Sequence, residues 1–156
     1  MRDPVAVRLM QSPLLARLAY NGVDGAPRVV PIGYVWTGSA LVMCTATMAP
    51  KVRALQKDPR VALEVDTDTD TQPPNILLVR GVASVEIVDG VPDEFLAASR
   101  KAVPEESWSD FEAQSRAMYP AMARISVTPH WAKVIDFEQR MPTAVEKLMA
   151  GKHDTA

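Results

Sequence analysis

Residues 27–66 decide the fold, and they read PRVVPIGYVWTGSALVMCTATMAPKVRALQKDPRVALEVD. Two apolar runs rich in β-branched residues, 28–36 and 41–47, flank a short break at 37–40, a pattern typical of a β-hairpin. Pro50 then begins a short helix to about Lys57, because proline at the first helical position lacks only an N–H that would have no partner there. Asp58-Pro59 ends the helix, since the residue before proline avoids the α region, and 60–66 form a third strand.

Lys51 is the informative residue of this stretch. It lies in the first turn of the predicted helix, where the positive end of the helix dipole disfavours a cation. A bound anion would account for it, because free N–H groups and the dipole make a helix N-terminus a phosphate site. The hydroxyls of Thr45 and Thr47, at the end of the preceding strand, are placed to join such a site. The alternative is a solvated surface lysine, which the pattern alone favours.

The composition indicates an ordinary globular domain. The chain has 156 residues, 47% hydrophobic and 23% charged, so a single domain over 1–156 can bury a core without disulfides or metals. The formal net charge of −2 gives no basic footprint for nucleic acid. The single cysteine, Cys44, excludes an internal disulfide and fits a reducing compartment.

No stretch of the sequence predicts export or a membrane span. The opening residues, MRDPVAVRLM, lack the apolar segment of a signal peptide. No run approaches the roughly 18 apolar residues of a membrane-spanning helix. We therefore expect a cytoplasmic protein with no membrane partner.

The rest of the chain predicts more strands, joined mostly by short turns, and a few helices. Strands are expected at 14–20, 76–80, 82–88, 123–127 and 131–137, and helices within 1–13 and at 92–103, 104–119 and 142–150. Gly81 indicates a bulge or bend, Thr128-Pro129 a break between two strands, and Gly151 the end of the last helix. Adjacent strands with tight turns pair antiparallel, and closing the sheet into a barrel would remove its edges.

Familiar catalytic and metal-binding patterns are absent from the sequence. His130 and His153 are the two histidines, and neither has a cysteine or histidine at ligand spacing, so we predict no metal site. No nucleotide-binding glycine motif or nucleophile elbow occurs. Because no side chain stands out as an acid or base, the sequence identifies no catalytic residue.

Several short motifs together resemble a known family. They are Gly25-x-Pro27-Arg28-Val29-x-Pro31, Thr45-x-Thr47, Pro50-Lys51-Val52-Arg53-x-Leu55, Asp58-Pro59-Arg60-Val61 and Val79-Arg80-Gly81. Their order and spacing, over roughly 14–137, resemble the FMN-binding split barrels related to pyridoxamine 5′-phosphate oxidase. The resemblance makes a bound anion the favoured interpretation of Lys51.

The resemblance implies a mainly β protein, a six-stranded antiparallel split β-barrel with flanking helices. It also implies a homodimer with a flavin-type cofactor in each of two clefts between the subunits. Carried over by position, Val30, Pro31, Ile32 and Gly33 would offer backbone groups along the isoalloxazine ring. Thr45, Ala46 and Thr47 would border the ring and the ribityl chain, and Lys51 would hold the phosphate.

One departure from the oxidases bears on the function. The oxidases carry an arginine just before the lysine, where this chain has Pro50, so a second cation must come from Arg53 or the partner chain. Arg53 is two residues further along the helix and points to a different side. The arginine-rich substrate signature of the oxidases is also missing, so we do not expect pyridoxamine phosphate oxidation.

The expected function is that of an FMN-dependent oxidoreductase acting on a small molecule. Relatives with similar motifs use the deazaflavin coenzyme F420, and others bind haem or bilins. The alternatives are therefore an F420-dependent reductase and a non-catalytic flavin- or haem-binding protein on the same barrel. In each flavin case the hydride chemistry belongs to the cofactor, while the protein supplies position and electrostatics.

Overall fold

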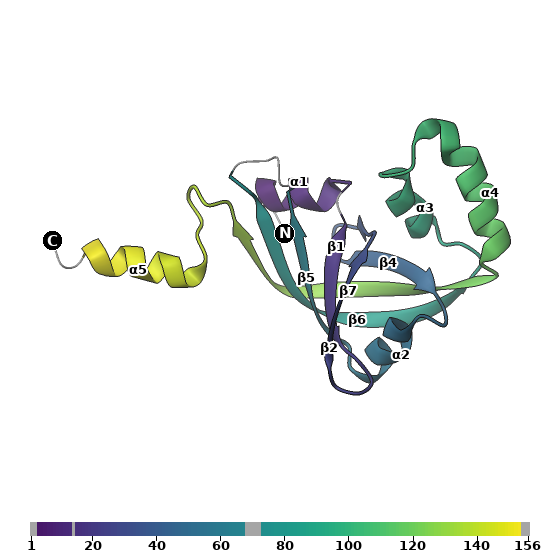
Figure 1. The fold of residues 1–156 in the computed structure, drawn as a ribbon, viewed down its shortest axis with the longest axis horizontal. Helices are drawn as coiled ribbons and strands as arrows, with labels where there is room; N and C mark the ends of the chain where they lie inside the picture. The colour runs from purple at the N-terminus through teal and green to yellow at the C-terminus, as the bar shows by residue number, and fades with distance from the viewer. Residues whose placement is uncertain (1–2, 14, 68–72, 154–156) are drawn as a thin grey trace.

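The computed structural model describes residues 3–13, 15–67 and 73–153 (Figure 1). The helices and strands follow one another as α1 (Pro4–Gln11), β1 (Ala16–Asn21), β2 (Pro27–Ile32), β3 (Val35–Trp36), β4 (Leu41–Ala46), α2 (Pro50–Lys57), β5 (Arg60–Asp66), β6 (Ile76–Asp89), α3 (Asp93–Arg100), the 3₁₀ turn η1 (Glu105–Ser107), α4 (Trp108–Met118), β7 (Ala121–Ile135) and α5 (Thr143–His153). No helix in the described part of the chain is both long and apolar enough to cross a bilayer.

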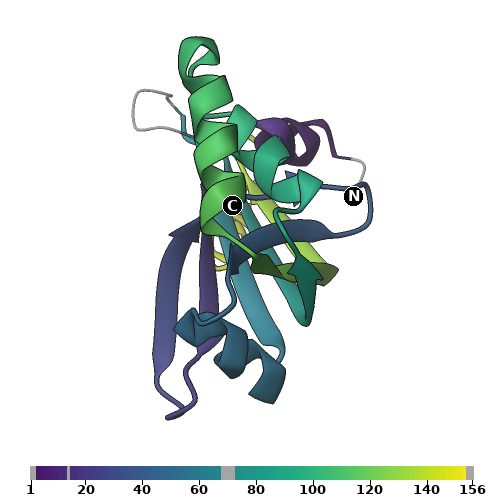
Figure 2. The same ribbon diagram turned by 90° about the vertical axis from the view of Figure 1, so that its right-hand side faces the viewer.

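The strands form one antiparallel sheet in the order β2-β1-β5-β6-β7-β4-β3. The sheet curls on itself around the long strands β6 and β7, and β2 and β3 are its two edge strands (Figure 2). The predicted mainly β split barrel is therefore confirmed. It has seven strands rather than six, because the run predicted as one strand at 28–36 is interrupted at Gly33 and Tyr34.

The pairing of β2 differs from the hairpin that was predicted between 28–36 and 41–47. β2 pairs with β1, from Asn21 opposite Pro27 to Ala16 opposite Ile32. Of the run 28–36, only the two-residue strand β3 pairs with β4, whose other neighbour is β7. The tight turn between β1 and β2 explains this choice. Its Gly25 has a φ of 82°, a conformation that glycine adopts at no steric cost.

The prediction of a bend at Gly81 is confirmed, but the prediction of a strand break at Thr128-Pro129 is wrong. β7 is continuous, and its register with β6 shifts between Arg80 and Gly81. A Cβ at Gly81 would lie 2.7 Å from the Thr128 carbonyl oxygen, so only glycine fits there. A proline is tolerated inside β7 because a bulge does not require its missing N–H.

The interior of the barrel is an apolar core closed by α1. Its largest fully buried side chains include Leu9, Met10, Leu18, Tyr34, Leu41, Met43, Leu55, Leu63, Leu77 and Ile125. Asp3 caps α1, accepting hydrogen bonds from the N–H groups of Val5 at 2.9 Å and Ala6 at 3.1 Å. The Tyr34 hydroxyl donates to the Leu9 carbonyl oxygen at 2.8 Å, and this hydrogen bond links α1 to the segment between β2 and β3.

Two helical regions lie outside the barrel. α3 and α4 pack against β4 through a second apolar cluster built on Val91, Leu96 and Met122. α5 stands away from the barrel, at the far end from α4 (Figure 1). The helix predicted at 142–150 is α5, and it continues through Gly151 to His153 instead of ending there.

Candidate functional site

The predicted cofactor residues lie in three separate segments of the chain. They belong to β2 and the residue after it, to the end of β4, and to the first turn of α2. α2 lies at one end of the barrel and the α3–α4 pair at the other (Figure 2). The candidate site therefore combines the edge strand β2, the end of β4 and the N-terminus of α2. The helices α3 and α4 lie at the opposite end of the barrel from α2 (Figure 2).

The N-terminus of α2 is uncapped. Pro50 occupies its first turn, and the N-cap residue Ala49 supplies no side-chain acceptor, whereas Asp3 caps α1 with a carboxylate. Pro50 has no N–H, and the Val52 N–H donates to the Ala49 carbonyl oxygen at 2.9 Å, so this terminus presents its positive dipole end and the N–H of Lys51 to whatever lies in front of it. The residues that precede α2, including the exposed Thr47, leave this end open to solvent.

Lys51 is a half-buried cation in this uncapped turn. Burial lowers the pKa of its ammonium, and no carboxylate among the described residues opposes that effect. A desolvated ammonium without an acid partner is held at a cost in free energy that an incoming anion would offset. The electrostatics of this turn therefore favour an anionic ligand.

A hollow of about 500 Å³ lies in front of α2 and brings two of the predicted residues together. Thr47 and Arg53 both line it, beside Met48 and Gln56. Lys51 does not line it, because residues two apart on a helix lie about 200° apart around its axis. The Lys51 ammonium and the Arg53 guanidinium therefore face different sides of α2.

The predicted residues of β2 divide between the two faces of the strand. Ile32 is buried in the barrel core and Val30 packs against it, while Pro31 is exposed on the outer face. β2 is an edge strand, so the backbone groups that do not pair with β1 have no strand partner in the sheet. That β2 lies along a cofactor ring stays a prediction.

The predicted residues of β4 also alternate. Thr45 shares its face of the strand with the buried Met43, whereas Cys44 and Ala46 point to the side covered by α3. Burial, and to a lesser degree the nearby Glu94 carboxylate, raises the pKa of the Cys44 thiol to about 11. Cys44 is thus a protonated, unreactive thiol at neutral pH.

A second pocket, which the sequence did not predict, lies under α3. It has a volume of about 250 Å³ and is lined by Gly33, Cys44, Phe95 and Phe111, among others. Of the predicted cofactor residues, Gly33 lines this pocket, whereas Thr47 and Arg53 line the hollow in front of α2. The aromatic residues Phe95, Trp108 and Phe111 within 92–119 are visible in the sequence, but their spacing does not distinguish a pocket lining from core packing.

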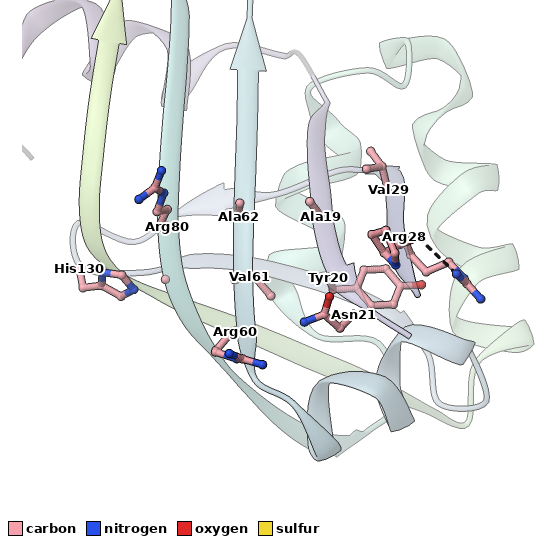
Figure 3. Close-up of a pocket in the computed structure, with 12 residues that line it drawn as sticks. Ala19, Tyr20, Asn21, Arg28, Val29, Arg60, Val61, Ala62, Arg80 and His130 are labelled. Atoms are coloured by element: carbon pink, nitrogen blue, oxygen red, sulfur yellow. Dashed lines mark hydrogen bonds between the residues drawn. The ribbon is translucent and has the colours of Figure 1, made fainter. Parts of the chain in front are cut away.

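Two further grooves cross the outer face of the sheet, over β1, β5 and β6 (Figure 3). The first, of about 370 Å³, has Ala19 and Ala62 at its floor and Arg60, Arg80 and His130 around it. The second continues towards Trp131, whose ring centre lies 4.5 Å from the guanidinium carbon of Arg80. This outer face combines exposed apolar side chains with a basic border.

Comparison with known proteins was made against family models, curated proteins and solved structures. No curated protein matches the chain. An F420 reductase is 24% identical, with 81% of this chain and 94% of that chain covered and a TM-score of 0.56. An FAD-binding protein from Mesorhizobium loti is 18% identical, with 83% and 88% covered and a TM-score of 0.55.

HutZ, the heme storage protein from Vibrio cholerae, is 18% identical, with 87% of this chain and 95% of that chain covered and a TM-score of 0.60. At these identities the three structures share a fold with this chain, while their own ligands differ. The model of the pyridoxamine 5′-phosphate oxidase family matches residues 3–136. Because this match spans most of the barrel and well over half of the sequence, the chain belongs to the pyridoxamine 5′-phosphate oxidase family.

Proposed function

We propose that this protein is an oxidoreductase that binds FMN and acts on a small molecule. The observation that carries the proposal is Lys51, a half-buried ammonium in the uncapped first turn of α2 that has no acid partner among the described residues. A phosphate monoester supplies the charge that this turn lacks. Coenzyme F420 has a similar ring and also carries a phosphate, so an F420-dependent reductase is the alternative form of the same proposal.

The predicted residues of β2, β4 and α2 would suit a molecule with an anionic end and a flat end. Lys51 and the α2 amides would hold the phosphate, with Thr47 and Arg53 bordering the hollow beside it. The edge backbone of β2, from Val30 to Gly33, would lie along the ring, and Thr45 and Ala46 would flank the chain between the two ends. When bound, a flavin supplies hydride or electron transfer, and this chain's own residues bind and orient it.

The active form is proposed to be a homodimer of twofold symmetry, with the cofactor site completed by the second copy. The support is the outer sheet face, where Val29 is 64% exposed and Trp131 38% exposed beside two grooves. A contiguous apolar face bordered by charges is typical of a protein interface. Permanent dimers usually bury more than about 2,000 Å².

A second candidate, from a different class, is a tetrapyrrole carrier without catalytic activity. The observation that favours it is His130, which lines the outer groove together with Arg60 and Arg80. An imidazole is a common axial ligand of haem iron, and guanidinium groups pair with carboxylates such as haem propionates. The HutZ fold similarity is in keeping with this candidate.

The absorbance spectrum of freshly purified protein, with mass spectrometry of whatever it releases on denaturation, tests these alternatives. Bands of oxidised flavin or a deazaflavin support the oxidoreductase, and an intense haem band supports the carrier. If the protein is colourless, titration with FMN, F420 and haemin identifies the ligand. Rapid reduction of the bound flavin by NADH or NADPH then argues against a carrier, and failure to bind FMN or F420 contradicts the proposed function.

A further inference from the structure

We infer that the pocket under α3 is a binding site for an uncharged, apolar ring compound, and that it receives the substrate. Its role as the substrate site rests on the proposed function, whereas its ligand class is argued from the pocket alone. The pocket lies between α3 and α4 on one side and the ends of β2 and β4 on the other. Phe95 and Phe111 supply its aromatic surface, and Gly33 and Cys44 supply its wall on the sheet side.

The size and aromatic lining of the pocket set the shape of the ligand. About 250 Å³ lies just below the range of about 300–1,000 Å³ typical of ligand pockets, so one or two fused rings fill it. The rings of Phe95 and Phe111 are stacked, with centres 6.1 Å apart and planes 13° apart. Aromatic rings in this arrangement bind flat apolar molecules by offset stacking or edge contacts.

Small residues keep the pocket open. The α3 side is formed by Ala98, Ser99 and Ala102, none of which reaches across the space. A Cβ at Gly33 would lie 3.7 Å from the Ala98 Cβ, so a larger side chain at either position would enter the gap. The pocket therefore exists because small residues face each other across it, Gly33 on the sheet side and Ala98 on α3.

Polar contacts at both ends of α3 hold the pocket in shape. At the start, Arg124 donates to Glu94 Oε1 from Nη2 at 2.6 Å and from Nε at 2.9 Å. Beyond the C-terminal end, the Lys101 ammonium donates to the Tyr34 carbonyl oxygen at 3.1 Å and to the Ser12 carbonyl oxygen at 3.3 Å. A helix fastened in this way gives a largely preformed site, as is usual for small-molecule pockets.

The lining selects against a charged ligand. None of the side chains that line the pocket is charged at neutral pH, and the nearby Arg124 and Glu94 neutralise each other. An ion entering this space would lose hydration and find no counter-charge. The polar groups at the wall are the Cys44 thiol and the Ser99 hydroxyl, and Ser99 already donates to the Phe95 carbonyl oxygen at 2.8 Å.

The position of the pocket suits a substrate rather than the cofactor phosphate. The hollow at α2 reaches Val23, in the turn before β2, whereas the pocket under α3 reaches Gly33, just after β2. A cofactor with its phosphate at α2 and its ring along β2 would therefore point its ring towards the pocket. A flat ligand in the pocket would then border the ring, where hydride transfer takes place.

The test is a titration of the full chain with 2-naphthol, an uncharged two-ring probe, and with naphthalene-2-sulfonate, which carries a charge on the same rings. Isothermal calorimetry should show naphthol binding at least tenfold more tightly than the sulfonate. Ala98→Leu should weaken naphthol binding at least tenfold by filling the pocket. Ala97→Leu, at the exposed neighbouring position of α3, should bind like the wild type. Equal affinity for the two probes, or unchanged naphthol binding by Ala98→Leu, would overturn the inference.

Further measurements separate this inference from the proposed function. FMN affinity should stay within twofold of the wild type in both variants, and naphthol should bind equally well with FMN present. If FMN displaces naphthol stoichiometrically, the pocket belongs to the cofactor ring and the inference is wrong. If the wild type binds naphthol but no flavin, the proposed function and the substrate role fail while the ligand class stands. Ser99→Leu, checked by thermal melting, replaces Ala98→Leu if that variant does not fold.

Discussion

The ammonium of Lys101 lies 3.1 Å from the carbonyl oxygen of Tyr34 and 4.9 Å from the centre of the Tyr34 ring. This contact joins the end of α3 to the short segment between β2 and β3, although the two residues are 67 apart in sequence. Because Tyr34 in turn donates to Leu9 of α1, a single chain of contacts links α3, the edge of the barrel and the helix that closes it.

Replacing Lys101 with methionine should destabilise the fold. The variant keeps the apolar stem but removes charge-assisted hydrogen bonds to two carbonyl oxygens, each typically contributing about 1.5–3 kcal/mol. Burial lowers the pKa of this ammonium, and this desolvation offsets part of the hydrogen-bond contribution. We therefore expect a net loss of about 2 kcal/mol in the free energy of unfolding, measured by urea denaturation. Lys57→Met is the matched control, because Lys57 also donates to a carbonyl oxygen, that of Val23, but from an exposed position. Equal losses in the two variants would argue against the contact.

The outer sheet face should decide the oligomeric state. Trp131→Glu places a charge in the apolar part of this face and removes the ring on which Arg80 stacks. We expect the wild type to be a dimer by light scattering at micromolar concentration and Trp131→Glu to be a monomer. Met118→Glu, at a residue of α4 that is also exposed, should remain dimeric. A monomeric wild type would refute the dimer and the shared site together.

The acid stability of the protein should depend on Asp136. Asp136 Oδ1 accepts from the N–H groups of Glu138, Gln139 and Arg140 at 2.8–3.1 Å, and Oδ2 accepts from Arg140 Nε at 2.7 Å. The backbone N–H groups, and then the Arg140 guanidinium, hold the pKa of this carboxyl well below its usual range. The stabilisation is fully present above the unfolded-state pKa of about 3.9 and is lost as the pH falls towards the folded-state value.

Asp136→Asn should therefore lower the melting temperature at pH 7 and flatten its dependence on pH below about 4, where the wild type loses this contribution. Thermal melts of both proteins between neutral and strongly acidic pH measure the difference. Parallel melting curves over the whole range would show that another group controls the acid transition. Glu138→Gln is the control, because in the part of the chain that the structure describes Glu138 joins this network through its backbone N–H and not through its side chain.

Cys44 should be slow to react with thiol reagents in the native protein. Burial and the neighbouring Glu94 raise the pKa of the Cys44 thiol to about 11, so little thiolate exists at pH 8. Ellman's reagent should modify Cys44 far more slowly in the native protein than in the protein unfolded with guanidinium chloride. Glu94→Gln should increase the native rate modestly, since burial is the larger cause. A native rate equal to the unfolded rate would show that the thiol is neither buried nor protonated.

The elements that local rules control were predictable from the sequence. Pro50 and Asp58-Pro59 bound α2 (Pro50–Lys57), and β5 (Arg60–Asp66) follows as expected, because proline acts on its own backbone and its neighbour's. Gly81 signalled a bulge because an isolated glycine in a strand leaves space for close backbone approach.

Long-range pairing was not predictable in the same way. The alternation in 28–36 shows which face of β2 is buried but not that its partner is β1 rather than β4. The pocket under α3 depends on Gly33, Cys44 and Phe95 meeting across three separate elements, which no local pattern encodes. Lys51 could be singled out because a cation in the first turn of a helix conflicts with the dipole, and such a conflict is visible in the sequence.

The central claim is that Lys51 holds a cofactor phosphate. Lys51→Ala removes a charge-assisted contact, so affinity for FMN should fall roughly ten- to a hundredfold. The stability of the cofactor-free protein should hold or rise slightly, because burial already lowers the pKa of this ammonium and no acid among the described residues compensates. Arg53→Ala should have a smaller effect, since Arg53 faces a different side of α2.

The decisive measurement is a paired titration of FMN and riboflavin into wild type and Lys51→Ala, followed by flavin fluorescence, with F420 in parallel. Lys57→Ala, in the last turn of the same helix, is the control and should bind both flavins like the wild type. The account predicts that Lys51→Ala loses affinity for FMN while riboflavin, which has no phosphate, binds both proteins equally. If Lys51→Ala binds FMN as tightly as the wild type, Lys51 does not contact the cofactor and the phosphate assignment is wrong.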